Sequence, residues 1–307
     1  MTPQTAFVVA GRDAEQISQL FIIMSVGALL VWAAVIAVAV YAIRSERRQH
    51  TAREAALFIV GGGVVVPTVV LAALLASGLP VLADILAPGP DATLRIDVTG
   101  MQWWWRVQYR VAGTTIESAN EIRVPVGRRV NLQLASRDVI HSFWVPSLAG
   151  KVDMIPGRTT RIALEPTRVG VFGGTCAEYC GASHARMHLD VVVVPPDEFE
   201  AWLTAQAGAA VPAEGLARQG ETAFASNGCT ACHTVRGRSA VGQVGPDLTH
   251  VGSRLRISAG ALPNTPERFA EWIASTDRVK PGSHMPAFRT LPAPELAALA
   301  AYLDGLQ

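Results

Sequence analysis

The chain has 307 residues, of which 50 % are hydrophobic and 17 % are charged. This length allows two or three domains at about 100–200 residues each, and the small charged fraction excludes a disordered chain. With 26 Lys and Arg against 25 Asp and Glu, the net charge is +1. That balance argues against nucleic acid as the main partner, because binding to phosphates needs a surplus of basic residues.

Two long apolar runs occupy the first ninety residues and predict a transmembrane helical hairpin, with spans at about 17–43 and 55–82. Each run is longer than the roughly 20 residues that a helix needs to cross a bilayer. The connecting segment contains Arg44, Arg47, Arg48 and Arg53, which places it on the cytoplasmic side. A signal peptide is the alternative for the first run, but its apolar length exceeds that of a signal core. Both termini, and everything after about Leu86, are therefore expected outside the cytoplasm.

Residues 91–203 are rich in short β-branched runs that are separated by Gly and Pro. Many short strands with frequent turns favour a β-sandwich or a barrel. The runs that predict strands are Thr93–Val98, Ile122–Val126, Val130–Leu134, Thr159–Leu164 and Leu189–Val194.

The four cysteines fall in two tight pairs, and the first pair belongs to a motif that predicts a copper site. Cys176 and Cys180 are followed by His184 and Met187, and Glu178 lies between the cysteines. Thiolate, imidazole and thioether ligands together select copper and suit electron transfer. Zinc is a weaker alternative, since its usual ligands do not include a thioether. A disulfide between the two cysteines is possible in an oxidising compartment, but the other ligand types at these offsets disfavour it.

One loop does not easily enclose a metal, so another strand is expected to contribute a ligand. His141, in the segment Asp138–Pro146, is the best candidate. It completes a set of two Cys, two His and one Met. Two thiolates four residues apart can bridge two copper ions instead of binding one.

On these residues, and over nearly all of residues 17–200, the chain resembles subunit II of cytochrome c oxidase. The resemblance implies a cupredoxin-like β-sandwich that holds a dinuclear copper (CuA) centre. By this resemblance Cys176 and Cys180 bridge the coppers, His141 and His184 bind one copper each, and Met187 is the weak ligand.

The resemblance also implies roles for three further regions. Glu178 binds copper through its backbone carbonyl, and its carboxylate faces a magnesium site at the border with subunit I. The segment Lys151–Arg158 matches the family at the same border. Trp103, the first of three consecutive tryptophans, is where electrons enter the copper site. Alternation along a strand sends neighbours to opposite faces, so the three tryptophans are not expected to lie all in the core. Trp104 and Trp105 are expected to serve in packing and in anchoring at the membrane interface.

Residues 204–214 are rich in Ala and Gly and predict a linker, followed by a haem domain at 215–307. The motif Cys229-Thr-Ala-Cys232-His233 is the attachment site of c-type haem, in which both cysteines bind the porphyrin and the histidine binds iron. A thioredoxin-like cysteine pair is the alternative, but no βαβ pattern surrounds it.

The second axial ligand of the haem is expected from the segment around residue 285. Met285 and His284 are both available, and resemblance to class I cytochromes c, which are all-α, favours Met285. Ligation by Met and His raises the reduction potential. The same resemblance makes the carbonyl of Pro246 the acceptor for the His233 ring.

The order of hairpin, copper domain, linker and cytochrome c domain resembles subunit II of caa3-type oxidases, a multidomain membrane protein. The resemblance implies the electron-input subunit of a proton-translocating cytochrome c oxidase in a bacterial inner membrane, with both cofactor domains on the periplasmic side. Electrons pass from the covalent haem to CuA and on to haem in subunit I, where oxygen is reduced to water.

Partners implied by this resemblance are subunits I and III, and cytochrome c or a quinol–cytochrome c reductase as donor. Two alternatives remain open at this point. They are an electron-input subunit of a nitric oxide reductase and a membrane-tethered electron shuttle.

Overall fold

The computed structural model describes residues 4–45, 51–89, 94–111 and 113–307. The chain forms two compact units, one of Glu15–Ala87 and one of Met1–Ala14 together with Pro88–Gln307. Arg47 and Arg48 of the predicted cytoplasmic loop, and Thr93 of the first predicted strand, lie outside the described residues.

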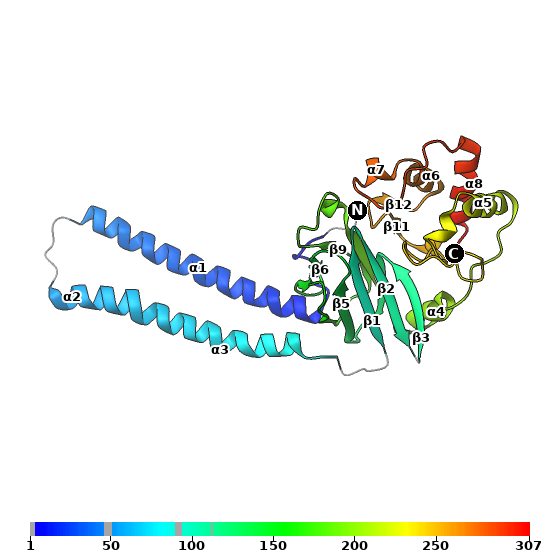
Figure 1. Cartoon of the computed structure of the whole chain (residues 1–307). Helices are drawn as coiled ribbons and strands as arrows, with labels where there is room; N and C mark the ends of the chain where they lie inside the picture. Colours follow the sequence, from blue (N-terminus) through cyan, green and yellow to red (C-terminus); the bar gives the residue numbers. More distant parts are fainter. Residues whose placement is uncertain (1–3, 46–50, 90–93, 112) are drawn as a thin grey trace. The chain divides into compact units, whose positions relative to one another are not determined.

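Two long apolar helices make up the first unit and lie side by side (Figure 1). The first is α1 (Arg12–Arg44), and the second runs through α2 (Ala52–Ala56), the π-helical η1 (Leu57–Val65) and α3 (Val66–Leu86). Thr51 and Glu54 form a capping box at the start of the second helix, which satisfies two backbone donors. Near the other end, Gln16 donates to Asp84 at 2.7 Å.

Both helices are long and apolar enough to cross a membrane, and their apolar windows are 0 % buried in the structure. Large exposed side chains of this kind are stable in lipid and costly in water. The predicted apolar spans are therefore confirmed as helices, and each helix extends a few residues beyond its predicted span.

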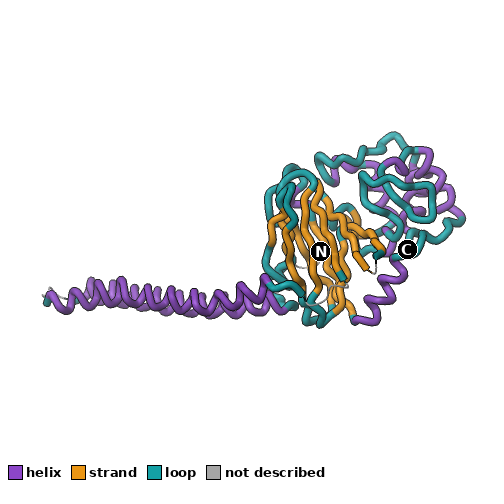
Figure 2. Tube along the Cα trace, turned by 60° about the horizontal axis from the view of Figure 1, so that its bottom comes forward, coloured by secondary structure: helices purple, strands orange, loops and turns teal. Residues whose placement is uncertain are grey.

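Residues 94–206, called here the β domain, fold as a sandwich of two five-stranded sheets (Figure 2). The first sheet has the order β3 (Thr114–Ala119), β2 (Trp104–Val111), β1 (Arg95–Met101), β5 (Val130–Ser136) and β8 (Thr160–Leu164). The second has the order β4 (Glu121–Pro125), β10 (His188–Val194), β9 (Gly170–Cys176), β6 (His141–Trp144) and β7 (Val152–Met154). The five predicted runs correspond to β1, β4, β5, β8 and β10, and the predicted sandwich is confirmed.

The core of the β domain lies between the sheets, because burial alternates along β1 and β2. Gly174 allows close packing here, since a Cβ atom at this position would meet Leu189 Cδ2 at 2.8 Å and Val145 Cγ2 at 2.9 Å. Helix α4 (Pro196–Gln206) closes the domain with Phe199 and Leu203, which belong to the same core cluster.

Residues 207–307, called here the helical domain, have a core of their own. Its elements are α5 (Gly215–Ser226), η3 (Cys229–Ala231), η4 (Val251–Ser253), β11 (Arg256–Ile257), β12 (Leu262–Pro263), α6 (Pro266–Ala274), α7 (Thr276–Val279) and α8 (Ala293–Asp304). Helices α5 and α8 cross at Gly220, where a Cβ atom would lie 1.9 Å from the carbonyl oxygen of Ala298. Thr265 caps α6 by accepting a hydrogen bond from the amide of Arg268.

The segment predicted as a linker is more ordered than its composition suggested. Residues 204–206 belong to α4. Beyond them, Ala210 N–H donates to the carbonyl of Arg236 at 3.0 Å, and the Arg238 side chain donates to the carbonyl of Val211 at 3.0 Å. The segment is thus hydrogen-bonded to the helical domain, because arginines from distant loops reach its carbonyls.

Candidate functional site

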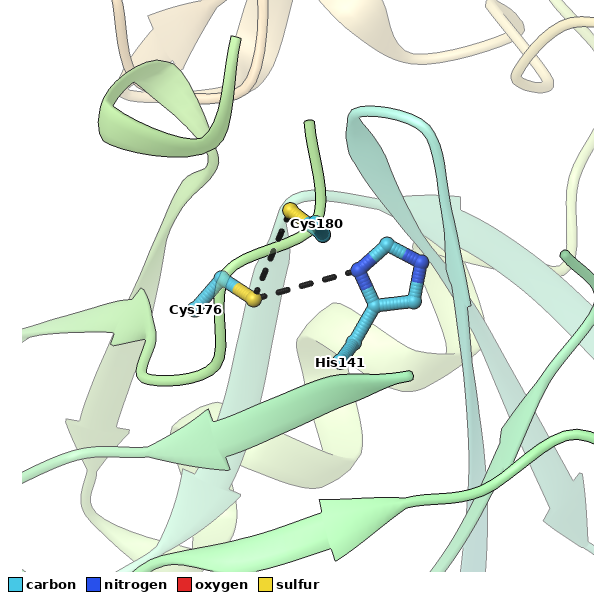
Figure 3. Close-up of side chains that lie close together, drawn as sticks. All are labelled: His141, Cys176 and Cys180. Atoms are coloured by element: carbon cyan, nitrogen blue, oxygen red, sulfur yellow. Dashed lines mark hydrogen bonds between the residues drawn. The ribbon is translucent and has the colours of Figure 1, made fainter. Parts of the chain in front are cut away.

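Three buried ligand-type residues meet at one end of the β domain (Figure 3). His141 begins β6, Cys176 ends β9, and Cys180 lies in the following loop. Cys176 Sγ lies 3.8 Å from His141 Nδ1 and 3.8 Å from Cys180 Sγ. A disulfide has its sulfurs about 2.05 Å apart, so both thiols are free in this structure. The ligand atoms of His141, Cys176 and Cys180 therefore lie close together, as the ligands of a metal ion do.

Three more of the predicted ligands lie around the same two sulfurs. His184 Nδ1 lies 3.5 Å from Cys180 Sγ, and Met187 Sδ lies 3.9 Å from it. The backbone carbonyl of Glu178 lies 3.2 Å from Cys176 Sγ. Each sulfur therefore has one imidazole beside it, and the thioether of Met187 is fully buried. Soft sulfur donors with imidazole fit copper better than zinc or a hard cation.

The electrostatics of the cluster favour a bound cation. The side-chain hydrogen bond between the two thiols lowers the pKa of Cys176, whereas the same contact and burial raise the pKa of Cys180. Burial disfavours the charged form of His141, but contacts with Cys176 and Asp138 outweigh it and raise its pKa. The buried pair of sulfurs therefore carries one negative charge readily. A second thiolate needs a compensating positive charge, which a metal cation supplies.

Asp138 is a candidate site residue that the sequence alone did not assign. Its Oδ1 atom lies 2.7 Å from His141 Nε2, so the ring presents Nδ1 to the sulfurs. Its Oδ2 atom accepts from the amide of Gln102 at 2.7 Å. A carboxylate that binds the far nitrogen of a ligand histidine fixes its tautomer and orientation. The sequence signal for this role was the position of Asp138, a carboxylate three residues before the candidate ligand His141.

Trp103 contacts the cysteine loop directly. Its indole Nε1 donates to the carbonyl of Cys180 at 2.9 Å, and Gln102 Nε2 donates to the same oxygen at 2.7 Å. Trp105 is wholly buried, edge-on to Phe143 with ring centroids 5.9 Å apart. The expected packing role of Trp105 therefore holds, and its expected role as a membrane-interface anchor is wrong. Trp104 alternates to the other face of β2, where it stacks under Arg106 at 5.3 Å.

The segment predicted to border another subunit lies next to the cluster. Asp153 accepts from Lys151 at 2.8 Å and from Ser142 at 2.8 Å. Ser142 follows the candidate ligand His141 in β6, so this carboxylate is connected to the strand that carries His141. Glu178 is half-buried.

The second pair of cysteines lines a cavity of about 560 Å³ whose wall is formed by the helical domain and by part of the β domain. Cys229 and Cys232 are free, and His233, His284 and Met285 share the cavity wall with them. Apolar side chains of the helical core complete the wall, among them Phe224, Phe269, Leu299 and Leu303. Two thiols, an imidazole and a thioether around an apolar cavity fit a covalently attached haem.

The His233 ring is held in one orientation. Its Nδ1 atom lies 2.9 Å from the carbonyl of Pro246, as predicted, which leaves Nε2 to a metal. Burial lowers the pKa of His233, so the ring is neutral and ready to bind iron. Gly245 makes room for the ring, because a Cβ atom at this position would lie 2.5 Å from His233 Cε1.

Met285 and His284 differ in their surroundings. Met285 is half-buried against the helical core, and its carbonyl accepts from Thr276 at 2.9 Å. His284 is exposed. The packing favours Met285 as the residue directed at the cavity.

Two protein families match the chain where these sites lie. Residues 110–194 match the family described as cytochrome C oxidase subunit II, periplasmic domain, and residues 217–307 match cytochrome c. Cytochrome c oxidase subunit 2 of Bacillus subtilis is 32 % identical over 255 residues, which cover 80 % of this chain and 70 % of that protein. The chain belongs to the cytochrome c oxidase subunit 2 family. Its helical domain is a cytochrome c domain, so the family implies copper and haem c as cofactors.

Two further relatives extend the comparison. Cytochrome c oxidase subunit 2 of Alkalihalophilus pseudofirmus is 40 % identical over 218 residues, and the match covers 71 % of this chain but 62 % of that relative. The crystal structure of the periplasmic domain of subunit II of cytochrome oxidase from Bradyrhizobium japonicum has 33 % identity and a TM-score of 0.37, over 38 % of this chain and 96 % of that one. The sequence relatives favour an oxidase over the nitric oxide reductase subunit and the electron shuttle.

Proposed function

We propose that this chain is the electron-input subunit of a haem-copper terminal oxidase that reduces oxygen to water. The observation that carries the proposal is the position of Trp103. Its indole donates to the carbonyl of Cys180, and its side chain also lines the cavity that contains His233 and Met285. One aromatic side chain thus contacts both candidate redox sites.

Each candidate ligand has a proposed role. A dinuclear CuA centre would be held by both thiolates, two imidazoles, the thioether and one carbonyl, from Cys176, Cys180, His141, His184, Met187 and Glu178. A haem would be attached through Cys229 and Cys232, and His233 and Met285 would bind its iron. Bound at these sites, the copper centre and the haem supply one-electron redox chemistry.

The protein's own contribution is to hold these ligands in fixed positions. Asp138 orients His141, and the carbonyl of Pro246 orients His233. Burial of Cys176, Cys180 and Met187 keeps water from the copper ligands. A fixed, water-poor ligand shell suits electron transfer, because little has to reorganise when the charge changes.

The proposed partners follow from the family. Subunit I receives the electrons and reduces oxygen, and subunit III completes the complex. The carboxylate of Glu178, with the neighbouring Lys151–Arg158 segment, faces a magnesium site at the border with subunit I. A soluble cytochrome c or a quinol–cytochrome c reductase supplies electrons.

The proposed location is the bacterial inner membrane. Helix α1 and the helix from Ala52 to Leu86 cross it, and Arg44 and Arg53 flank the connecting loop. By the positive-inside rule this loop is cytoplasmic. The β domain, the cytochrome c domain and both termini are then periplasmic.

The deciding experiment measures the metal content and the electron paramagnetic resonance spectrum of the purified full chain, loaded with copper and haem. We expect two coppers with a mixed-valence signal and one low-spin haem c. The variant Cys180→Ser should lose the mixed-valence signal and keep the haem. A wild-type chain that holds one copper or none, with Cys176 and Cys180 joined in a disulfide, would refute the copper assignment.

A second experiment tests Trp103. In Trp103→Phe, copper reduction after rapid reduction of the haem should slow, with both cofactors retained. Trp202→Phe is the matched control, since Trp202 packs against Tyr109 with ring centroids 5.2 Å apart and contacts neither site. Equal transfer rates in the two variants would assign Trp103 a purely structural role.

A further inference from the structure

The cavity that carries the haem motif is walled by both domains of its unit. Cys232, His233 and Met285 line it from the cytochrome c domain, and Trp103 and Trp104 line it from the β domain. Trp103 is only 7 % exposed. Packing against it is close, because a Cβ atom on Gly282 would lie 2.7 Å from its ring.

Lys280 joins the two domains at this wall. Its Nζ atom donates to the backbone carbonyl of Trp103, across 177 positions of sequence, and lies 3.3 Å from the carbonyl of Ser258. The residue is 4 % exposed, and burial lowers its pKa to about 7. Burying an ammonium is costly, so stability alone gives no reason for a lysine here. Its contact fixes the position of the Trp103 backbone against the cytochrome c domain.

Arg256 makes a second connection. It donates to both carboxylate oxygens of Asp190 in β10, with Nε 2.7 Å from Oδ2. The side chains are 16 % and 4 % exposed, so water screens this pair little. A bidentate, poorly solvated pair fixes orientation as well as distance.

Further hydrogen bonds join the two domains on either side of the ion pair between Arg256 and Asp190. The Leu255 amide donates to Glu121 Oε2 at 2.8 Å, and the His188 amide donates to the carbonyl of Ala259 at 3.0 Å. Ser183 donates to the carbonyl of Pro281 at 2.7 Å. These bonds join two segments of the β domain to two of the cytochrome c domain.

We infer that Arg256 and Lys280 are positioning residues that hold the cytochrome c domain closed over Trp103, so that a soluble donor has no access to this face of the β domain. The inference rests on the proposed function. It assigns the Trp103 surface to one occupant, the chain's own cytochrome c domain. An external donor then delivers electrons only to the cytochrome c domain.

The test follows hydrogen exchange of the full chain, loaded with both cofactors, by mass spectrometry. The variants are Arg256→Gln and Lys280→Met, and the control is Arg268→Gln, whose ion pair with Glu271 is exposed and lies within α6. We expect exchange at the amides of Leu255 and His188 to rise at least about tenfold in the first two variants, since loss of one partner of a poorly solvated pair commonly costs this much or more. The control should match wild type.

Peptides from α8 and β1 report on folding of the two domains and should not change. Arg256→Lys, which keeps the charge, should recover part of the lost protection. Unchanged exchange at Leu255 and His188 in both variants would overturn the inference.

A measurement on the wild-type chain needs no variant. Hydroxyl-radical footprinting should modify Trp103 as slowly as the buried Trp105, and more slowly than the half-buried Trp144. Modification of Trp103 as fast as Trp144 would show an open face and overturn the inference. These readouts do not require electron transfer. If Trp103 is protected but the haem does not reduce the copper, only the proposed function is contradicted. If the haem reduces the copper while Trp103 is open to solvent, only this inference is contradicted.

Discussion

Replacing Asp138 tests whether a carboxylate outside the metal ligands sets the affinity of the copper site. Asp138 Oδ1 lies 2.7 Å from His141 Nε2, and Oδ2 accepts from the amide of Gln102 at 2.7 Å. A hydrogen bond to a charged group contributes about 1.5–3 kcal/mol. The lower part of this range applies, because 29 % of the Asp138 side chain is exposed.

A loss of about 1.5–2.5 kcal/mol corresponds to a roughly 10- to 70-fold weaker affinity for copper. We expect a fall of this size in Asp138→Ala and a smaller one in Asp138→Asn, which keeps the shape and one acceptor. The assay is copper titration against a competing chelator, followed by the charge-transfer absorption of the site. Asp97→Asn is the control, because Asp97 pairs with Arg95 and Arg110 and does not contact the ligands. Copper affinity within twofold of wild type in Asp138→Ala would refute the reasoning.

Three further substitutions have direct outcomes. Met187→Leu keeps the volume of a fully buried side chain, so the site should still bind copper with an altered spectrum and potential; an unchanged spectrum would remove Met187 from the ligand set. Met285→Ala should open the sixth position of the haem, so that the reduced protein binds carbon monoxide; failure to bind would favour His284 or another ligand. Gly220→Ala places a methyl group 1.9 Å from the Ala298 carbonyl oxygen, so α5 and α8 have to separate. The expected cost is about 3 kcal/mol, which lowers the melting temperature of the cytochrome c domain by about 12–24 °C; calorimetry that shows a shift under 4 °C would contradict this packing.

The local ligand motifs were readable from the sequence because their chemistry depends on residues close together in the chain. Cys229, Cys232 and His233 form one turn, and Cys176, Cys180 and Met187 lie in one short segment between the end of β9 and the start of β10. Apolar runs and alternating strands are local patterns too, so the helices and five of the strands were also predictable. His141 was inferred by elimination, since one loop cannot enclose a metal.

Tertiary structure alone decided which distant groups support those motifs. Asp138 lies only three residues before His141, but the folded loop before β6 is what places its carboxylate 2.7 Å from His141 Nε2 in the candidate copper site. Lys280 met the Trp103 carbonyl across 177 positions, and Arg236 joined the expected linker to the cytochrome c domain. A local pattern records which face of one element is apolar and which ligands lie on it. It contains no information on which carbonyl a long cationic side chain will reach, because that depends on how separate elements pack.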